Sequence, residues 1–400
     1  MPGESPLGMM HPARMPKRRG SAADKPRRRA WLILLPPLIV AALALGWCWL
    51  WSYAASVANR TLSQWMAAEA VAGRSYSCAS QQTSGFPFSI DLRCRQAAAE
   101  IKSNEPPFAV TAKAVTFAAK LYRPTSLNGD VTGPLTLAEL GQPPRFVANW
   151  ANARISVQGV PPMPERASLT LDHPRVEGAG ANDQVFFQAD NAQFDGRIVQ
   201  GSPASNPVIE AVLTFSAAVA PTLHPILADR LNGDIDAVLQ GFKDLSPKPW
   251  SARFREMQAA GGAIEIKALR IERTDVTIVG TGTLKVNEHG RLDGLIRVAI
   301  SGLDTLIPLL GIDKMIGQGI DRLTGDQSGS PGGLGTLDRL LPGLSGVVRD
   351  SANAGVIDNL KKMGEPTKID NKPAVMLPLR VADGDVYLGM VPLGQLPALF

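Results

Sequence analysis

The chain has 400 residues, which is enough for one large domain or two of ordinary size. Its formal net charge is +5, but the charge is distributed unevenly. Residues 1–30 hold eight of the 41 basic and two of the 36 acidic side chains, which leaves 33 against 34 in the rest of the chain. Because the bulk of the chain is close to neutral, it is not predicted to bind nucleic acid through a basic face.

An apolar segment follows the basic tail. No charged side chain occurs from Ala30 to Asn59, and the run from Trp31 to Trp51 is apolar throughout. A helix of about 20 residues crosses the hydrocarbon core of a bilayer, so residues 31–52 are predicted to form a transmembrane helix. The basic side chains of residues 1–30 favour a cytoplasmic N-terminus, which places everything after the helix across the membrane.

A cleaved signal peptide is the alternative interpretation of this segment. Ser56-Val57-Ala58 offers the small-x-small pattern of a cleavage site. The apolar run is longer than the roughly 7–15 residues of a signal sequence, however. Trp47, Trp49 and Trp51 also cluster at its far end, as aromatic side chains do at a membrane–water interface. These features favour an uncleaved anchor.

Residues 53–73 are predicted to form a helical stem, because Leu62, Trp65 and Met66 recur at helical spacing and Gly73 can end a helix. The pattern then changes to the period of two that is typical of strands. Alternating runs lie at 88–94, 108–121, 153–157, 167–171, 185–189, 208–215, 264–271, 276–286, 295–300, 375–381 and 386–388. The apolar parity switches between Ala114 and Val115, which predicts a bulge or a bend.

The fold class predicted from these runs is mainly β (α+β): residues 74–400 form a large antiparallel β-rich domain with a few packing helices. Within Pro221–Phe242 a helical face is predicted from Leu223, Ile226, Leu227 and Leu231, and Asn232-Gly233-Asp234 then opens a short apolar alternation. Further helices are predicted over Leu303–Leu323 and Leu337–Met363. The Gly/Ser-rich residues 324–336 are predicted to be a flexible loop.

The three cysteines divide into two kinds. Cys48 lies within the predicted membrane span and is expected to act as a small hydrophobic residue. Cys78 and Cys94 lie beyond the span, and in an oxidising compartment they are expected to form a disulfide. Closing such a loop contributes about 3 kcal/mol in the chain-entropy model.

Signatures of catalysis are sparse. The sequence has no phosphate-binding glycine-rich loop and no G-x-S-x-G motif. The histidines, His11, His173, His224 and His289, are scattered without metal-ligand spacing. His173 and His289 are interpreted as turn residues, as are Asp383 and Asp385 on either side of Gly384. No catalytic residue, metal site or cofactor is therefore predicted.

The block Gly85-Phe86-Pro87-Phe88 lies between Cys78 and Cys94. Gly85 tolerates positive φ and Pro87 restricts the chain, so a tight turn is expected. The two phenylalanines, Phe86 and Phe88, are predicted to plug the end of a β core, with contact to a partner or to lipid as the alternative.

Two of these motifs carry a resemblance. A cysteine, a G-[FY]-P-F block and a strand that ends in cysteine, shortly after an N-terminal membrane helix, resemble a bacterial family of uncharacterised proteins, domain of unknown function family 2125. Leu377-Pro378-Leu379-Arg380 and the segments that follow to Pro392-Leu393-Gly394 look like its C-terminal signature. The strand Gly280-x-Gly-x-Leu284 is also similar, more weakly, to repeats of AsmA-like envelope proteins.

The resemblance implies a single-pass protein of the bacterial inner membrane with a periplasmic domain, and it brings no catalytic residues with it. We expect a non-enzymatic protein that binds membrane lipid in an apolar groove or maintains the envelope. A scaffold that docks other envelope proteins and a hydrolase with an unrecognised site are the alternatives. An apolar sheet face that is left open favours lipid, whereas one plugged by helices favours the scaffold.

Overall fold

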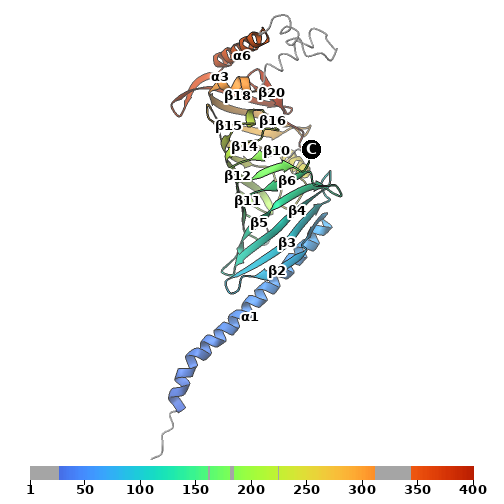
Figure 1. Cartoon of the computed structure of the whole chain (residues 1–400), viewed down its shortest axis with the longest axis vertical. Coiled ribbons are helices and arrows are strands. Elements are labelled where there is room, and N and C mark those ends of the chain that lie inside the picture. The colour runs from blue at the N-terminus through green and yellow to red at the C-terminus, as the bar shows by residue number, and fades with distance from the viewer. Residues whose placement is uncertain (1–26, 161–162, 181–183, 224, 311–343) are drawn as a thin grey trace, which may run out of the picture. The chain divides into compact units, whose positions relative to one another are not determined.

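The computed structural model describes residues 27–160, 163–180, 184–223, 225–310 and 344–400 of the chain (Figure 1). Contacts divide the chain into two compact units, Met1–Ala54 and Ala55–Phe400. The predicted loop over 324–336, and the parts of the predicted C-terminal helices that surround it, lie outside the described residues.

Helix α1 spans Arg27–Val71 and contains Pro36 and Pro37. From Leu34 onward it is long and apolar enough to cross a membrane, with a mean hydropathy of 1.8 over its most apolar window. Length and composition of this kind fit either a single-pass anchor or a signal sequence.

The last turns of α1 belong to the second unit and pack on its first strands. Trp65 stacks on Tyr76 with ring centroids 4.8 Å apart. Glu69 accepts a hydrogen bond from Arg74 at 2.5 Å, and both side chains are largely buried. Burial raises the pKa of the Tyr76 hydroxyl above its ordinary value. These contacts make the end of the helix part of the β domain.

The second unit is built almost entirely from strands. Its first half contains β1 (Arg74–Ser77), β2 (Ser80–Ser84), β3 (Ser89–Ile101), β4 (Phe108–Lys120), β5 (Arg123–Glu139), β6 (Phe146–Asn149), β7 (Asn152–Gln158), β8 (Arg166–Asp172), β9 (Arg175–Gly178) and β10 (Val185–Gln188). Its second half contains β11 (Asn191–Ser202), β12 (Ser205–Ala218), β13 (Leu231–Leu239), β14 (Ile264–Arg273), β15 (Val276–Val286), β16 (Leu292–Ser301), β17 (Glu365–Ile369), β18 (Lys372–Ala382), β19 (Asp385–Leu388) and β20 (Val391–Gln395).

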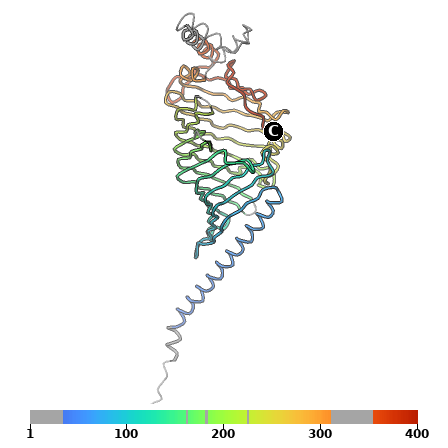
Figure 2. Tube along the Cα trace, turned by 45° about the vertical axis from the view of Figure 1, so that its right-hand side comes forward, coloured from blue at the N-terminus to red at the C-terminus, as the bar shows by residue number. Residues whose placement is uncertain are grey.

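All strand pairings are antiparallel within one sheet, so the predicted fold class is confirmed. The main path runs β3–β4–β5–β7–β8–β11–β12–β13–β14–β15–β16–β18. Spatial order therefore follows chain order closely, and the colours in Figure 2 change steadily along the sheet. The short strands β6, β9 and β10 form a side branch next to β5.

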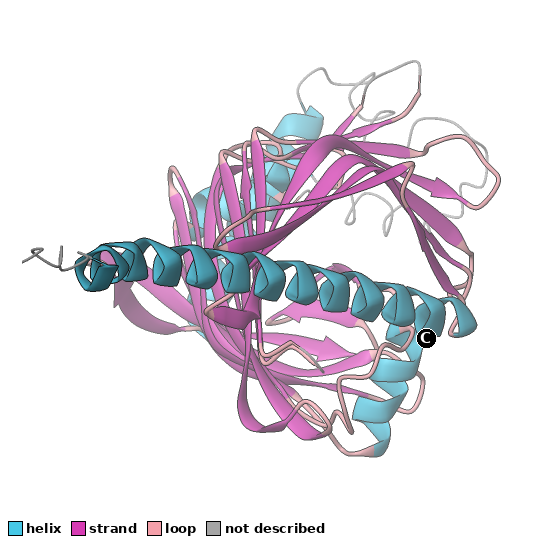
Figure 3. Ribbon diagram, turned by 90° about the horizontal axis from the view of Figure 1, so that it is seen from below, coloured by secondary structure: helices cyan, strands magenta, loops and turns pink. Residues whose placement is uncertain are grey.

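The sheet is curved when seen along its length (Figure 3). One source of the curvature is an irregularity in the register between β4 and β5, where Ala112 is paired with Leu135 but Ala114 with Thr132. An extra residue on one strand bends it and increases its twist. Here one residue of β4, Lys113, stands opposite two of β5, Gly133 and Pro134, so the extra residue is on β5. The irregularity lies close to the switch of parity after Ala114, but it does not change the alternation of β4, and a bulge in that strand stays a prediction.

Among the described residues, three helices accompany the sheet: α2 (Trp250–Ala259), α3 (Leu303–Leu309) and α6 (Leu344–Met363). The helical face predicted within Pro221–Phe242 is wrong. The described residues of that stretch form a 3-10 turn at Pro225–Leu227 and then strand β13, where the apolar alternation is predicted. Pro221 and Pro225 lack backbone N–H groups, which removes hydrogen bonds that a longer helix would need.

Candidate functional site

One face of the sheet carries an unbroken row of uncharged, mostly large apolar residues. The register pairs each of them directly with the next across twelve strands: Leu92, Phe117, Gly129, Ile155, Leu169, Phe194, Leu213, Ile235, Leu269, Gly280, Val298 and Leu377. A parallel row two residues along each strand is equally apolar, from Ile90 through Val157, Ala211 and Ile266 to Leu379. We call this surface the apolar face.

The opposite face of the same strands is polar. The row directly behind the first one runs Arg93, Thr116, Asp130, Arg154, Thr170, Gln193, Thr214, Asp234 and Arg270 before it becomes apolar on β15. Side chains alternate between faces along a strand, so this pattern places one face in water and leaves the other to be covered.

Helices cover the apolar face at its C-terminal end. Ile307 of α3 and Leu360 of α6 pack with Val298 and Leu377 in the largest buried cluster. Val298 is 3% and Leu377 1% exposed. Lys361 of α6 contacts Asp304 of α3 at 2.7 Å and joins the two helices. We call this cluster the end core, and it is the plugged part of the sheet.

The same face is partly exposed over the earlier strands, where Leu92, Ile155 and Leu169 are half-buried. Phe117, Phe194 and Leu213 are 40%, 41% and 39% exposed, although they occupy the same row as the buried residues of the end core. Phe194 and Leu213 are direct cross-strand partners. Adjacent exposed apolar side chains such as Phe194 and Leu213 favour a place where a protein or lipid binds.

Helix α2 covers one border of the apolar face. Its Met257 is fully buried and packs with Phe242, Val286 and the strand residues Leu239 and Ile264. The sequence contained the signal for this helix, because Trp250, Phe254 and Met257 recur at positions i, i+4 and i+7. The helix was not among the predicted elements.

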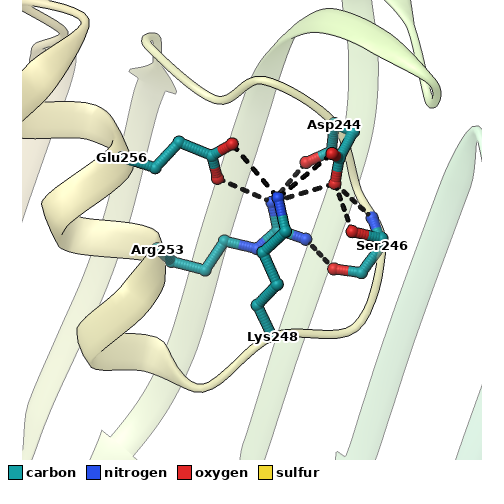
Figure 4. A network of polar contacts seen from close by, with 5 residues as sticks. All are labelled: Asp244, Ser246, Lys248, Arg253 and Glu256. Carbon is teal, nitrogen blue, oxygen red and sulfur yellow. Dashed lines mark hydrogen bonds and ion pairs between the residues drawn. The ribbon is translucent and has the colours of Figure 1, made fainter. Parts of the chain in front are cut away.

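A polar network fixes α2 to the loop that precedes it (Figure 4). Arg253 is buried and donates hydrogen bonds to the backbone oxygens of Asp244 and Ser246. Its Nη1 also lies 3.2 Å from Glu256 Oε2, and Lys248 bridges Asp244 and Glu256 at 3.0 and 3.2 Å. Each buried charge therefore has an opposite charge and hydrogen-bond partners, as buried ion pairs require.

The carboxylate of Asp244 should make the stability of this network pH-dependent. Hydrogen bonds from the Ser246 hydroxyl, followed by Lys248, hold the pKa of Asp244 well below its ordinary value of 3.8. A carboxylate with a depressed pKa in the folded state stabilises the fold above its ordinary pKa and loses that contribution as the pH falls below it.

We therefore expect Asp244→Asn to flatten the fall of the melting temperature between about pH 4 and pH 2 relative to the unmodified protein. The variant should also melt at a lower temperature at pH 7, because an amide accepts weaker hydrogen bonds from Lys248 than a carboxylate does. Glu288→Gln, at an exposed turn, is the control. Parallel pH profiles for the Asp244 variant and the unmodified protein would contradict this assignment.

The cysteines and the Gly-Phe-Pro-Phe block lie at the first edge of the sheet. Cys78 and Cys94 form a disulfide, with their Cα atoms 5.5 Å apart, which ties the start of the domain to β3. Gly85 adopts φ +101°, and a Cβ there would approach Ser89 Oγ to 2.5 Å, so the β2–β3 turn requires glycine.

The prediction that Phe86 and Phe88 plug a β core is wrong. Their side chains are 53% and 65% exposed. The turn that carries them joins β2 to β3 at the end of that hairpin. The block acts as a turn, and its phenylalanines add to the exposed apolar surface of the first strands.

The other polar residues considered from the sequence do not converge. His173 follows β8 with φ 51°, and its backbone N–H donates to Asp190. His289 lies in the β15–β16 turn, 3.5 Å from Asp383. His11 and His224 are outside the described residues. Over the part of the chain that the structure describes, no three His, Cys, Asp or Glu side chains are grouped to hold a metal ion.

What the second unit offers chemically is therefore a long apolar surface with a polar back. Twelve strands about 4.8 Å apart make a row roughly 50 Å long. One leaflet of a bilayer is roughly 15 Å of hydrocarbon, half of the full core. The row is thus longer than an acyl chain, and its open part is accessible along several strands.

Comparison with known proteins agrees with the resemblance in the sequence. The family described as "Uncharacterized protein conserved in bacteria (DUF2125)" matches residues 51–397, which includes the whole sheet and the end of α1. No curated protein matches the chain. The match covers most of the chain, from the end of the apolar segment to the last strand, and the chain belongs to the DUF2125 family of uncharacterised bacterial proteins.

Proposed function

We propose that this chain is a non-enzymatic, membrane-anchored envelope protein that holds lipid acyl chains on the open part of its apolar face. The apolar row that crosses twelve strands supports this proposal, because it stays uncharged from Leu92 to Leu377 and is exposed at Phe117, Phe194 and Leu213. Acyl chains cover such a surface without needing hydrogen-bond partners.

The apolar N-terminal helix supports the location. It fits an anchor in the inner membrane, and the disulfide fits a periplasmic domain, where such bonds form and persist. On this proposal the anchor keeps the domain next to the membrane, and the apolar face shields the acyl chains of the bound lipid from water.

Crosslinking at matched positions tests the proposal. A photoreactive amino acid is placed at Phe194, on the apolar face, or at its neighbour Gln193, on the polar face, in the full chain in cells. We expect lipid adducts at position 194 by mass spectrometry, and at least tenfold fewer at position 193, because acyl chains avoid the polar face.

Two outcomes would contradict the proposal. Equal lipid yields at both positions would show that labelling does not depend on the face. Protein adducts at position 194 in place of lipid would favour the scaffold, which the same exposed apolar surface also suits.

A further inference from the structure

A cationic side chain, that of Arg273, lies on the apolar side of the sheet. Leu269, Ile271 and Arg273 alternate along the end of β14 and therefore point to the same face. The register pairs Arg273 directly with Val276, which is 5% exposed and belongs to the end core. Arg273 thus lies at the rim of the apolar face, where the open surface meets the plugged part.

The guanidinium of Arg273 is only half satisfied. Its Nη2 donates to Asp229, whose own side chain is mostly exposed. Its Nη1 is buried and has no hydrogen-bond partner. A guanidinium has five N–H donors, and a buried cationic donor without an acceptor is costly. Among the residues that the structure describes, no oxygen accepts a hydrogen bond from this side of the fork.

A second unsatisfied group occurs on the loop that contacts Arg273. The β12–β13 connection carries Asp229, and it also carries Thr222, whose Oγ1 is buried without a partner. Among the described residues only one other side chain, Asp236, has such an atom. Asp236 is the Cα partner of Val212, which lies between Ala211 and Leu213 and so on the polar face. The loop that supplies Asp229 to Arg273 thus carries a second unsatisfied group.

We propose that Arg273 binds the phosphate of a phospholipid whose acyl chains lie on the apolar face. This inference rests on the proposed function and names its substrate class. The planar fork of arginine matches phosphate oxygens in a bidentate manner, and Nη1 is the donor that remains for it.

The test uses the full chain in detergent micelles with two photoactivatable lipids of identical acyl chains, phosphatidylglycerol and diacylglycerol. Crosslinks are mapped to peptides by mass spectrometry, and only those in β12–β15 are counted, so that lipid around α1 does not contribute. In the unmodified protein we expect phosphatidylglycerol to label these peptides about tenfold more than diacylglycerol, as a charge-assisted hydrogen bond allows.

Arg273→Gln should lower phosphatidylglycerol labelling about tenfold, to the level of diacylglycerol, and leave diacylglycerol labelling unchanged. Unchanged diacylglycerol labelling also shows that the variant is folded. Arg273→Lys should be intermediate, because it keeps the charge and loses the planar fork. Arg270→Gln is the matched control: it removes an arginine three residues earlier on the polar face, where Glu272 and Asp370 pair with it.

The inference is overturned if the Arg273→Gln variant keeps its preference for phosphatidylglycerol, or if the Arg270→Gln variant loses it equally. Displacement of phosphatidylglycerol by millimolar inorganic phosphate would assign the site to free phosphate instead. Equal labelling of the unmodified protein by both lipids overturns this inference alone, whereas labelling by neither lipid overturns the proposed function.

Discussion

Replacing Phe194 and Leu213 together by lysine should abolish lipid labelling of the apolar face. The two residues are direct partners on β11 and β12 and are about 40% exposed, so lysines fit there without a clash. Each substitution removes a large apolar side chain, worth about 1.5–3 kcal/mol when buried, and adds a charge that acyl chains cannot solvate. We expect at least a tenfold loss of crosslinked lipid from the full chain in cells.

The control is the neighbouring pair on the polar face. Gln193 and Thr214 are also direct cross-strand partners, and each hydrogen-bonds an aspartate, Asp195 and Asp234. Lysines at these positions lie next to the aspartates Asp195 and Asp234, which carry the opposite charge, and should leave lipid labelling unchanged. A loss of labelling in both double variants would mean that added charge, and not the apolar face, determines the result.

Truncating Ile307 to alanine should destabilise the domain far more than truncating Leu213. Ile307 is fully buried in the end core between α3 and the sheet. Removing its buried methyl and methylene groups costs about 2–5 kcal/mol. Leu213 is 39% exposed in the open part, so Leu213→Ala should cost less than about 1.5 kcal/mol without lipid.

Unfolding of the full chain in detergent, followed by tryptophan fluorescence, measures both effects. Added phospholipid should raise the melting temperature of the Ile307→Ala variant as much as that of the unmodified protein, because the lipid surface is intact. It should raise that of the Leu213→Ala variant less. Similar destabilisation by the two truncations would contradict the division into an open part and an end core.

The strands were predictable because one side of the sheet is apolar. The alternation along residues 276–286 is strong enough to define β15 without any other information. Strand β11 was missed because its apolar members, Phe194 and Ile198, are separated by Gly196, which interrupts the pattern. The irregularity between β4 and β5 was not visible in this way, because its extra residue is on β5 and leaves the alternation along β4 unchanged.

The apolar face as a continuous surface was not predictable. Each strand shows that one of its sides is apolar, but the alignment of twelve such sides depends on register, which long-range pairing decides. The same limit applies to Arg273. In the sequence it is one of many arginines at a strand end, and only its pairing with Val276 shows which face it occupies.

The close match between spatial order and chain order has a consequence for how the protein forms. Most strands hydrogen-bond with the next strand along the chain, so few of the strand pairings join segments that are far apart in the sequence. A topology of this kind folds by short loop closures and can add strands in sequence as the polypeptide is delivered. Helix α6 and the strands that complete the end core are the last elements of the chain. Most of the sheet can therefore form before helices cover the apolar face at its C-terminal end.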